Sequence, residues 1–307
     1  MKGTLLPVDL MCAGEVFEDL IFHGLPRLPR PGEELRTGQF VRTSGGGTLI
    51  TAVAAARSGA RVAVLSALSH AGTARLRAES IRVTNLRQHH EAHAVSVALS
   101  SRRDRAFVTF EGVNEVLEAR LLASFSRRLP PARHLHLALG PRDLSSWADV
   151  LDRCRRRGIT TSWDFGWHAD LPDRRGFPAL LGALDWVFVN EGEARHYASA
   201  TTLAGAVVRW RSLARQSVIK RGARGAMAIA NGGVVRAPAI RVGVVDTTGA
   251  GDAFNGGFLA ALLAGQRLAA CLRAGVRLGS LSTRAAGGLD GLPSREELVG
   301  ARARSDR

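Results

Sequence analysis

The chain of 307 residues is long enough for one large α/β domain or two small ones. Its composition, 46% apolar and 6% aromatic, is that of an ordinary globular protein. No apolar run approaches the ~18 residues that a membrane helix needs, and the first residues lack the apolar core of a signal peptide. The three cysteines, Cys12, Cys154 and Cys271, lie far apart. These features argue against a membrane protein and predict reduced thiols in a cytoplasmic protein.

The formal net charge of +15 raises the question of nucleic-acid binding. All but two of the 42 basic residues are arginines, the exceptions being Lys2 and Lys220. The arginines are spread along the whole chain and are not interleaved with aromatic residues. We therefore do not expect a nucleic-acid partner, although the positive charge favours attraction of a polyanionic nucleotide.

The first part of the chain contains short strands separated by glycine-rich and proline-rich turns. Residues 8–13 predict a strand that ends at Gly14, and the partial alternation over residues 34–42 predicts a short edge strand. The turn Ser44-Gly45-Gly46-Gly47 precedes an apolar stretch, residues 49–56, that predicts a helix ending at Gly59. Backbone without side chains at this turn lets a small polyol approach closely. Further strands are predicted over residues 61–68, 93–99 and 105–109.

From residue 134 onward strands and helices alternate, which is the pattern of a parallel sheet covered by helices. The predicted elements are strands over residues 134–139, 159–165, 185–190 and 217–220, and a helix over residues 144–157. Residues 226–240 predict a β-hairpin that turns at Asn231-Gly232-Gly233. Ligands of parallel sheets gather at the carboxyl ends of the strands, so a binding site is expected at that edge.

The segment from Val244 to Phe258 contains the strongest functional signal. Small residues, Gly249, Ala250 and Gly251, precede a predicted helix over residues 254–263, so backbone N–H groups and the helix dipole are free to bind an anion. Asp252 follows directly. A carboxylate beside a phosphate is repulsive unless it accepts a proton from an attacking hydroxyl group. We therefore interpret this segment as an anion hole with Asp252 as general base; the alternative is that Asp252 only caps the helix.

The sequence Asp246-Thr-Thr-Gly-Ala-Gly-Asp252-Ala-Phe closely resembles the C-terminal signature of the PfkB family of ribokinase-like carbohydrate kinases. Gly45-Gly46 and the small residues 52–60 resemble the N-terminal signature, and Asn190-Glu-Gly-Glu193 matches the family's Asn-x-x-Glu motif. The resemblance extends over residues 8–299. It implies an α/β fold, a three-layer sandwich with a mostly parallel central sheet. It also implies that residues 1–307 form a single kinase domain, with a small β-lid from about residues 15–42 and 93–112.

The resemblance also implies roles for individual residues. Asp19, Gly45 and Gly46 match positions that hold the sugar, and Asn190 and Glu193 match positions that organise Mg²⁺ and its waters. Lys220, Gly222 and Gly225, with Asn190, match the turns that border the phosphates of ATP. Asp246 and Thr248 match positions that bind a monovalent cation, such as K⁺, in some members. The family places the adenine near the helical region predicted over residues 268–286, which Gly287-Gly288 ends; residues 301–307 are expected to be a loose tail.

The sugar side departs from the family pattern at several positions. Gly47 stands where ribokinase has a lysine, and Ile50 stands where the family usually has an asparagine. A carboxylate found after the fourth strand in ribokinase falls near Gly140, and the segment over residues 69–85 is shorter than in most members. These changes place ribose in doubt as the substrate.

The sequence thus predicts a kinase that transfers the γ-phosphoryl group of ATP to a hydroxyl group of a sugar or sugar-like compound. One alternative is a nucleoside kinase of the same fold, since the lost polar contacts and Ile50 suit a substrate with a base. Another is a relative that binds a sugar or nucleotide without turnover. An exposed lid sheet favours pairing into a homodimer.

Overall fold

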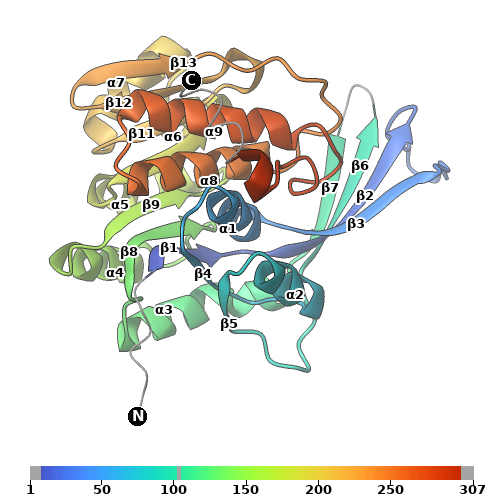
Figure 1. Ribbon diagram of the computed structural model, residues 1–307, viewed down its shortest axis with the longest axis horizontal. Helices are drawn as coiled ribbons and strands as arrows, with labels where there is room; N and C mark the ends of the chain where they lie inside the picture. The colour runs from blue at the N-terminus through green and yellow to red at the C-terminus, as the bar shows by residue number, and fades with distance from the viewer. Residues whose placement is uncertain (1–7, 102–104, 299–307) are drawn as a thin grey trace.

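The computed structural model describes residues 8–101 and 105–298, so the predicted tail at residues 301–307 lies outside the described part. A nine-stranded sheet runs through the middle of the molecule in the order β13-β12-β11-β10-β9-β8-β1-β4-β5 (Figure 1). Its strands from β11 to β5 are parallel, and β12 and β13 add an antiparallel edge. A separate four-stranded sheet has the order β3-β2-β6-β7.

The elements have the following bounds. The strands of the central sheet are β1 (Val8–Gly14), β4 (Val62–Ser66), β5 (Arg82–Asn85), β8 (Ala132–Ala138), β9 (Thr160–Asp164), β10 (Trp186–Asn190), β11 (Ser217–Lys220), β12 (Ala226–Ala230) and β13 (Gly233–Ala237). The strands of the small sheet are β2 (Phe17–Leu25), β3 (Gln39–Gly45), β6 (Val95–Ser101) and β7 (Arg105–Phe110). The helices are α1 (Gly47–Arg57), α2 (His70–Ala78), α3 (Leu117–Arg127), α4 (Leu144–Arg156), α5 (Phe177–Ala183), α6 (Glu191–Tyr197), α7 (Leu203–Leu213), α8 (Ala250–Leu263) and α9 (Leu268–Ser282).

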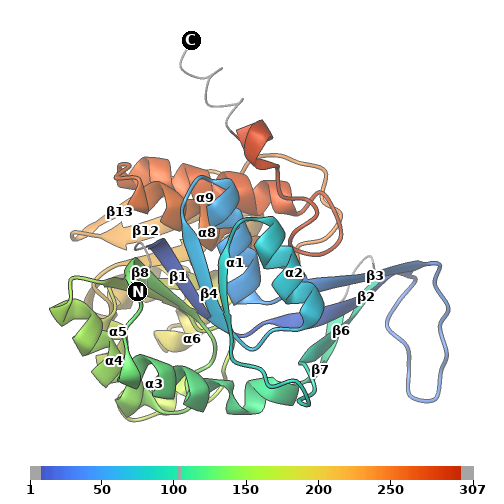
Figure 2. The same cartoon turned by 60° about the horizontal axis from the view of Figure 1, so that its bottom comes forward.

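Helices cover both faces of the central sheet, which gives the three-layer α/β sandwich that the sequence predicts. Helices α1, α2, α8 and α9 enclose one apolar core, and α3 to α7 enclose the other (Figure 2). Because both faces are covered, the central strands are apolar throughout; the first four residues of β10, for example, are all buried. Helix α8 lies between α1 and α9 and is buried over most of its length, which fixes the position of its N-terminus.

Most of the elements predicted from the sequence are present, with shifts of a few residues at their ends. The hairpin of β12 and β13 turns at residues 231–232, where Asn231 and Gly232 have φ values of 49° and 75°. This left-handed backbone suits glycine and asparagine, which is why the turn was readable from sequence. The long C-terminal helix is shorter than predicted, since α9 ends at Ser282 rather than near residue 286.

The small sheet differs from the sequence-based expectation in two details. The edge strand predicted over residues 34–42 is β3, which begins only at Gln39 because the preceding residues form turns and loop. Strand β2, by contrast, was expected only through the family resemblance.

Within the segment of residues 69–85, the structure has helix α2, capped by the Ser69 side chain, and strand β5 at the edge of the central sheet.

None of the helices in the described residues is long and apolar enough to cross a membrane.

Candidate active site

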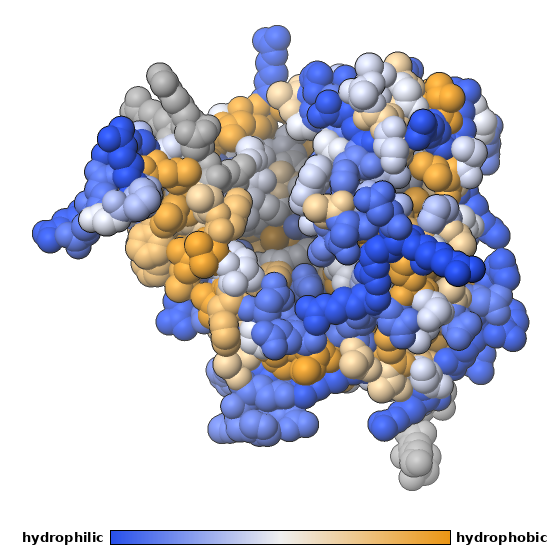
Figure 3. All heavy atoms as spheres, turned by 180° about the vertical axis from the view of Figure 1, so that it is seen from behind, coloured by the Kyte–Doolittle hydropathy of each residue, from blue (hydrophilic) through white to orange (hydrophobic). Residues whose placement is uncertain are grey.

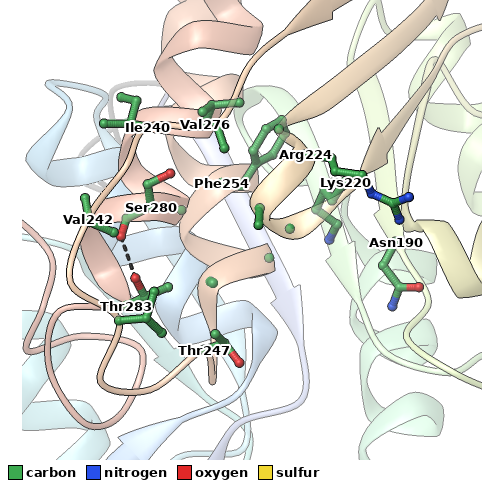
Figure 4. A pocket seen from close by; sticks show the side chains of 18 of the residues that line it. Asn190, Lys220, Arg224, Ile240, Val242, Thr247, Phe254, Val276, Ser280 and Thr283 are labelled. Atoms are coloured by element: carbon green, nitrogen blue, oxygen red, sulfur yellow. Dashed lines mark hydrogen bonds between the residues drawn. The ribbon is translucent and has the colours of Figure 1, made fainter.

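The carboxyl ends of β9, β10 and β11 and the N-terminus of α8 surround a cavity of about 1010 Å³. Figure 4 shows its side chains: Asn190 and Lys220 lie at one end, and Ile240, Val242 and Val276 lie at the other. Phe254, Ser280 and Thr283 also line the apolar end, which is next to α9. The cavity therefore joins a charged end to an apolar end, as a nucleotide with phosphates and a base requires.

The N-terminus of α8 forms the charged end of this cavity together with the ends of the strands. Gly249 is the N-cap residue, with a left-handed backbone at φ 70°. A β-carbon at Gly249 would lie 2.6 Å from Ile50 Cδ1 and 2.8 Å from Gly288 Cα, so the packing of this turn requires glycine. Ala250, Gly251 and Asp252 all line the cavity. The Ala250 N–H donates to the Thr247 carbonyl oxygen at 3.3 Å and the Asp252 N–H to that of Gly249 at 3.1 Å, and the partial positive charge of the helix dipole at this end suits an anion.

Asp252 lies in the first turn of α8 and is not its cap, because Gly249 occupies that position and, among the described residues, no side chain caps the helix. Burial, together with the nearby negative charge of Asp164, raises the pKa of Asp252 to about 7. A carboxylate with this pKa is a competent general base near neutral pH. The hydroxyl group of Thr51 donates to the Asp252 backbone carbonyl at 3.1 Å and ties α8 to α1.

Asp19 and Gly45 lie on the neighbouring strands β2 and β3 and are brought together. The Asp19 side chain packs against the α-carbon of Gly45: a β-carbon there would lie 2.7 Å from Asp19 Cγ and would overlap Oδ2. Burial and the negative charge of Asp246 raise the pKa of Asp19 to about 7. Gly46 is the N-cap of α1 with φ 94°, and its β-carbon would lie 2.8 Å from the Glu15 carbonyl oxygen. Both glycines are therefore required by close packing.

Gly47 connects this region to Asp252. A β-carbon at Gly47 would lie 3.2 Å from Asp252 Oδ1 and 3.0 Å from Ala138 Cβ. The three glycines 45–47 thus form a floor without side chains that runs from Asp19 to Asp252.

Asn190 and Glu193 form a complete capping box at the start of α6. The Asn190 backbone N–H and side-chain amide donate to the Glu193 carboxylate at 2.7 and 2.6 Å, and the Glu193 N–H donates to Asn190 Oδ1 at 2.9 Å. Burial and the charge of Asp164 raise the pKa of Glu193. Carboxylate and amide oxygens are hard donors, and each accepts more than one contact, so the pair fits a magnesium ion that keeps its waters. Among residues 8–101 and 105–298 there is no cluster of three or more His, Cys, Asp or Glu side chains that could hold a metal directly.

Lys220 ends β11 and forms an ion pair that sequence reasoning missed. Its Nζ donates to Asp164 Oδ2 at 2.6 Å, and the Asn255 amide donates to the same oxygen at 2.7 Å. Burial raises the pKa of Asp164, but the Lys220 ammonium and these hydrogen bonds outweigh it, so the carboxyl pKa is lowered. The sequence placed a strand end near Asp164, which is where ligands gather, but it gave no sign of a partner 56 residues away.

Two glycines of the β11–β12 turn also border the cavity. Gly222 has φ 56°, and Gly225 has φ 78° and packs so closely on the Ala237 carbonyl group that a β-carbon would overlap it. Arg224 donates to Glu191 at 2.8 Å, which holds this turn against α6. Asn190, Lys220, Gly222 and Gly225 therefore share one end of the cavity.

Asp246 organises the loop that precedes the anion hole. One carboxylate oxygen accepts the backbone N–H of Thr248 at 2.9 Å and its hydroxyl group at 2.8 Å, and the other accepts the Gly287 N–H at 2.9 Å. Its own backbone N–H donates to the Thr283 carbonyl oxygen at 3.1 Å. Asp246 thereby links the loop to the end of α9.

Two of the positions that depart from the family pattern have structural explanations. Ile50 is buried and packs between Gly249 and Gly288, so it supports the anion-hole turn and belongs to the core. The His168 imidazole fills the space where a side chain at Gly140 would lie. The backbone of His168 is held there, since its N–H donates to the Tyr197 hydroxyl group at 3.1 Å and its carbonyl oxygen is 3.0 Å from His196 Nε2.

These features fit an α/β kinase, and the comparisons with known proteins agree. The chain matches the pfkB family carbohydrate kinase model over residues 9–295 and belongs to that family. It is 27% identical to the ribokinase of Bacillus subtilis (strain 168) over 279 residues, which cover 88% of this chain and 91% of the relative. The family places the protein among the ATP-dependent sugar and nucleoside kinases, which typically use Mg²⁺.

Solved structures show the same fold at lower sequence identity. A ribokinase from Cryptococcus neoformans in complex with ADP superimposes with a TM-score of 0.79 at 22% identity and covers 96% of this chain and 99% of that one. An adenosine kinase from Sinorhizobium meliloti has a TM-score of 0.79 at 20% identity and covers 97% and 99%. These likenesses confirm the ribokinase fold and do not distinguish between sugar and nucleoside substrates.

Proposed function

We propose that the protein transfers the γ-phosphoryl group of ATP to a hydroxyl group of a sugar or sugar-like compound, with Asp252 as the general base. The observation that carries the proposal is the pair of buried carboxylates, Asp19 and Asp252, at the two ends of the glycine floor formed by residues 45–47. One carboxylate lies at the helix terminus that suits a phosphate, and the other lies on the small sheet, away from it.

The acceptor binds on the glycine floor in this proposal. Asp19 accepts hydrogen bonds from its hydroxyl groups, and Gly45 and Gly46 let its ring approach the backbone. Gly47 carries no side chain that would crowd Asp252, since a β-carbon there would lie 3.2 Å from Asp252 Oδ1. The small sheet acts as a lid that excludes water from this space, so that the phosphoryl group goes to the acceptor.

Asp252 takes the proton of the reacting hydroxyl group as its oxygen attacks the γ-phosphorus atom in line with the leaving ADP. The first N–H groups of α8, near Gly249, Ala250 and Gly251, stabilise the charge on the transferred group. Asn190 and Glu193 would hold Mg²⁺, and the ion would supply positive charge for the phosphates. Asp246 and Thr248 form the proposed site for a monovalent cation such as K⁺.

The small sheet also presents an apolar surface that we propose pairs with a second copy of the chain. Phe40, Val108 and Phe110 are each more than half exposed and share one face of this sheet, whereas Phe107 lies on the opposite face, with Asp19 and Ile21. In Figure 3, which views the molecule from behind Figure 1, apolar side chains gather over the small sheet beside a hollow in the surface. An exposed apolar sheet of this kind is stabilised by pairing. Analytical ultracentrifugation should give a dimer that dissociates when Val108, which is 67% exposed on this face, is replaced by glutamate, and a monomeric wild-type chain would contradict this part of the proposal.

A nucleoside kinase is the second candidate, because the solved structures that share this fold include an adenosine kinase and a nucleoside kinase. Ile50 does not favour this candidate, since it packs in the core. The retained Asp252, Asn190 and Glu193 argue against a relative that binds without turnover.

The decisive test is ADP release by the purified protein with Mg-ATP, measured against sugars, sugar acids, sugar phosphates and nucleosides. Turnover with a sugar-like compound supports the proposal, and turnover with nucleosides alone favours the second candidate. The absence of turnover with the whole panel, while calorimetry still detects ATP binding, would overturn the proposed activity.

A further inference from the structure

Three side chains from separate elements meet beneath the anion hole: Asp164 from β9, Lys220 from β11 and Asn255 from α8. Asp164 Oδ2 accepts both the Lys220 ammonium at 2.6 Å and the Asn255 amide at 2.7 Å. Asn255 Oδ1 lies 3.4 Å from Lys220 Nζ and completes a triangle. Asn255 is fully buried, and the side chains of Asp164 and Lys220 are only 10% and 13% exposed.

The ammonium group of this triangle lies directly beside the N-terminus of α8. A β-carbon at Gly251 would lie 3.0 Å from Lys220 Nζ, so the glycine leaves the space that the lysine occupies. A cation is unfavourable at the positive end of a helix dipole. Burial disfavours its charge as well, but the negative charges of Asp164, Glu193 and Asp252 outweigh burial and raise the pKa of Lys220. The side chain is therefore a cation at neutral pH, and its ammonium group is held beside the anion hole.

We propose that Lys220 is a catalytic residue that contacts the transferred phosphoryl group, and that Asp164 and Asn255 are positioning residues that hold its ammonium group against the anion hole. This inference rests on the function proposed above. An ammonium group has three protons. Asp164 takes one and Asn255 lies at the limit of hydrogen-bond distance from a second, which leaves a third for a phosphoryl oxygen.

Lys220 stays protonated and positively charged throughout the transfer step. The acceptor hydroxyl group loses its proton to Asp252, and its oxygen forms a bond to the γ-phosphorus atom. The bond from that phosphorus to the β–γ bridging oxygen breaks, and ADP leaves with the electron pair. Lys220 keeps its proton and neutralises charge on the equatorial oxygens, as a preorganised donor.

The charges around Asp252 provide a test that a purely structural role does not pass. Asp252 on α8 faces Lys220 on β11, Asp164 on β9, Glu193 on α6 and Asp19 on β2. Removing the cation should raise the pKa of Asp252, and removing the Asp164 charge should lower it. Loss of packing alone has no reason to move this pKa in opposite directions.

The experiment compares Lys220→Met, Asp164→Asn and the double variant with the wild-type chain. The pKa of Asp252 is measured by carboxyl ¹³C NMR, with the resonance assigned from Asp252→Asn. Calorimetry measures the affinity for Mg-ADP and for a non-hydrolysable ATP analogue, and kcat is measured on an acceptor identified by the panel. Arg57→Met is the matched control, because Arg57 and Glu79 form an ion pair of similar burial at 2.6 Å, away from the cavity.

We expect Lys220→Met to lower kcat by about 10²-fold or more. It should weaken binding of the ATP analogue about tenfold more than that of ADP, and raise the Asp252 pKa by about one unit.

Asp164→Asn should lower kcat about tenfold and lower the Asp252 pKa. The double variant removes both buried charges and should fold even if Lys220→Met alone does not. It should keep the low kcat with an Asp252 pKa near the wild-type value. Arg57→Met should change stability only.

Wild-type kcat in Lys220→Met, or in the double variant if the single variant does not fold, would overturn the proposal. So would equal losses of affinity for ADP and the ATP analogue, or pKa shifts of the same sign in the two single variants. If the wild-type chain phosphorylates no acceptor, the proposed function fails. The NMR and calorimetry still decide the role of Lys220, because they need no turnover.

Discussion

The side chain of Asp19 lies directly on the α-carbon of Gly45, so that any side chain at residue 45 would overlap its carboxylate. Asp19 follows the first strand of the central sheet and Gly45 ends the edge strand of the small sheet, 26 residues later in the chain. The pairing of β2 with β3 brings them together, with Phe17 opposite Gly45 and Asp19 opposite Thr43. The contact is part of the proposed acceptor site and gives the first prediction.

Gly45→Ala should displace the Asp19 carboxylate and raise the KM for the acceptor about tenfold or more, while the affinity for ADP changes little. The reason is steric, since the new methyl group and the carboxylate cannot occupy the same space. Steady-state kinetics and ADP calorimetry measure the two effects. Gly38→Ala is the control, because a β-carbon there meets no atom within 4 Å. Equal KM values for the two variants would show that Asp19 does not bind the acceptor.

Asp252→Asn should lower kcat by about 10²-fold or more, because an amide cannot accept the hydroxyl proton. The fold and ADP binding should persist, since the N-cap position of α8 is occupied by Gly249 and not by Asp252. Circular dichroism and calorimetry verify these two conditions. Turnover comparable to that of the wild-type enzyme would remove Asp252 from the mechanism.

Activity should fall as the pH drops below neutral. Burial and the charge of Asp164 raise the pKa of Asp252 to about 7. The base works only when it is deprotonated, so kcat should fall about tenfold per unit at pH values below 7. A pH–rate profile with saturating acceptor and nucleotide measures the midpoint. A flat profile between pH 5 and 8 would contradict this assignment.

Stability should have the opposite dependence on pH. The pKa values of Asp19 and Asp252, about 7 when folded, exceed those of unfolded aspartates. Between about pH 4 and pH 7 the folded chain therefore binds more protons than the unfolded chain, and the free energy of unfolding falls as the pH rises. Denaturant unfolding at several pH values tests this sign. The double variant Asp19→Asn/Asp252→Asn should lose most of the dependence, and an unchanged dependence in it would assign the effect to other groups.

Ile50→Asn, which introduces the residue that most family members have, should destabilise the protein by about 2–4 kcal/mol. Ile50 is 1% exposed and packs on Gly249 and Gly288, so an amide there loses apolar burial and its hydrogen bonds with water. Ile50→Val should cost about 0.5–1.5 kcal/mol and serves as the control. Both values come from chemical denaturation. Equal stability of the asparagine variant and the wild-type chain would mean that the turn rearranges to admit a polar side chain.

The sequence alone determined the fold class, the family and the segments that form the site. Local patterns suffice for these, because the alternation of strands and helices reflects burial on both faces, and runs of small residues ahead of a helix mark backbone that a ligand can approach. Parallel strands also share one carboxyl edge, which is why Asn190 and Lys220 were expected near one another; the family resemblance added Asp252.

The tertiary structure decided which side chains are partners. Asp164, Lys220 and Asn255 are far apart in sequence, and only the strand order β11-β10-β9 and the packing of α8 bring them into one triangle. The same holds for Ile50, which looked like a lost polar contact and is a core residue, and for His168, which fills the space beside Gly140. Sequence patterns show at what spacing buried residues repeat along one helix or strand. They carry no information on which distant element supplies the opposing charge, because that depends on how the packed layers place their ends.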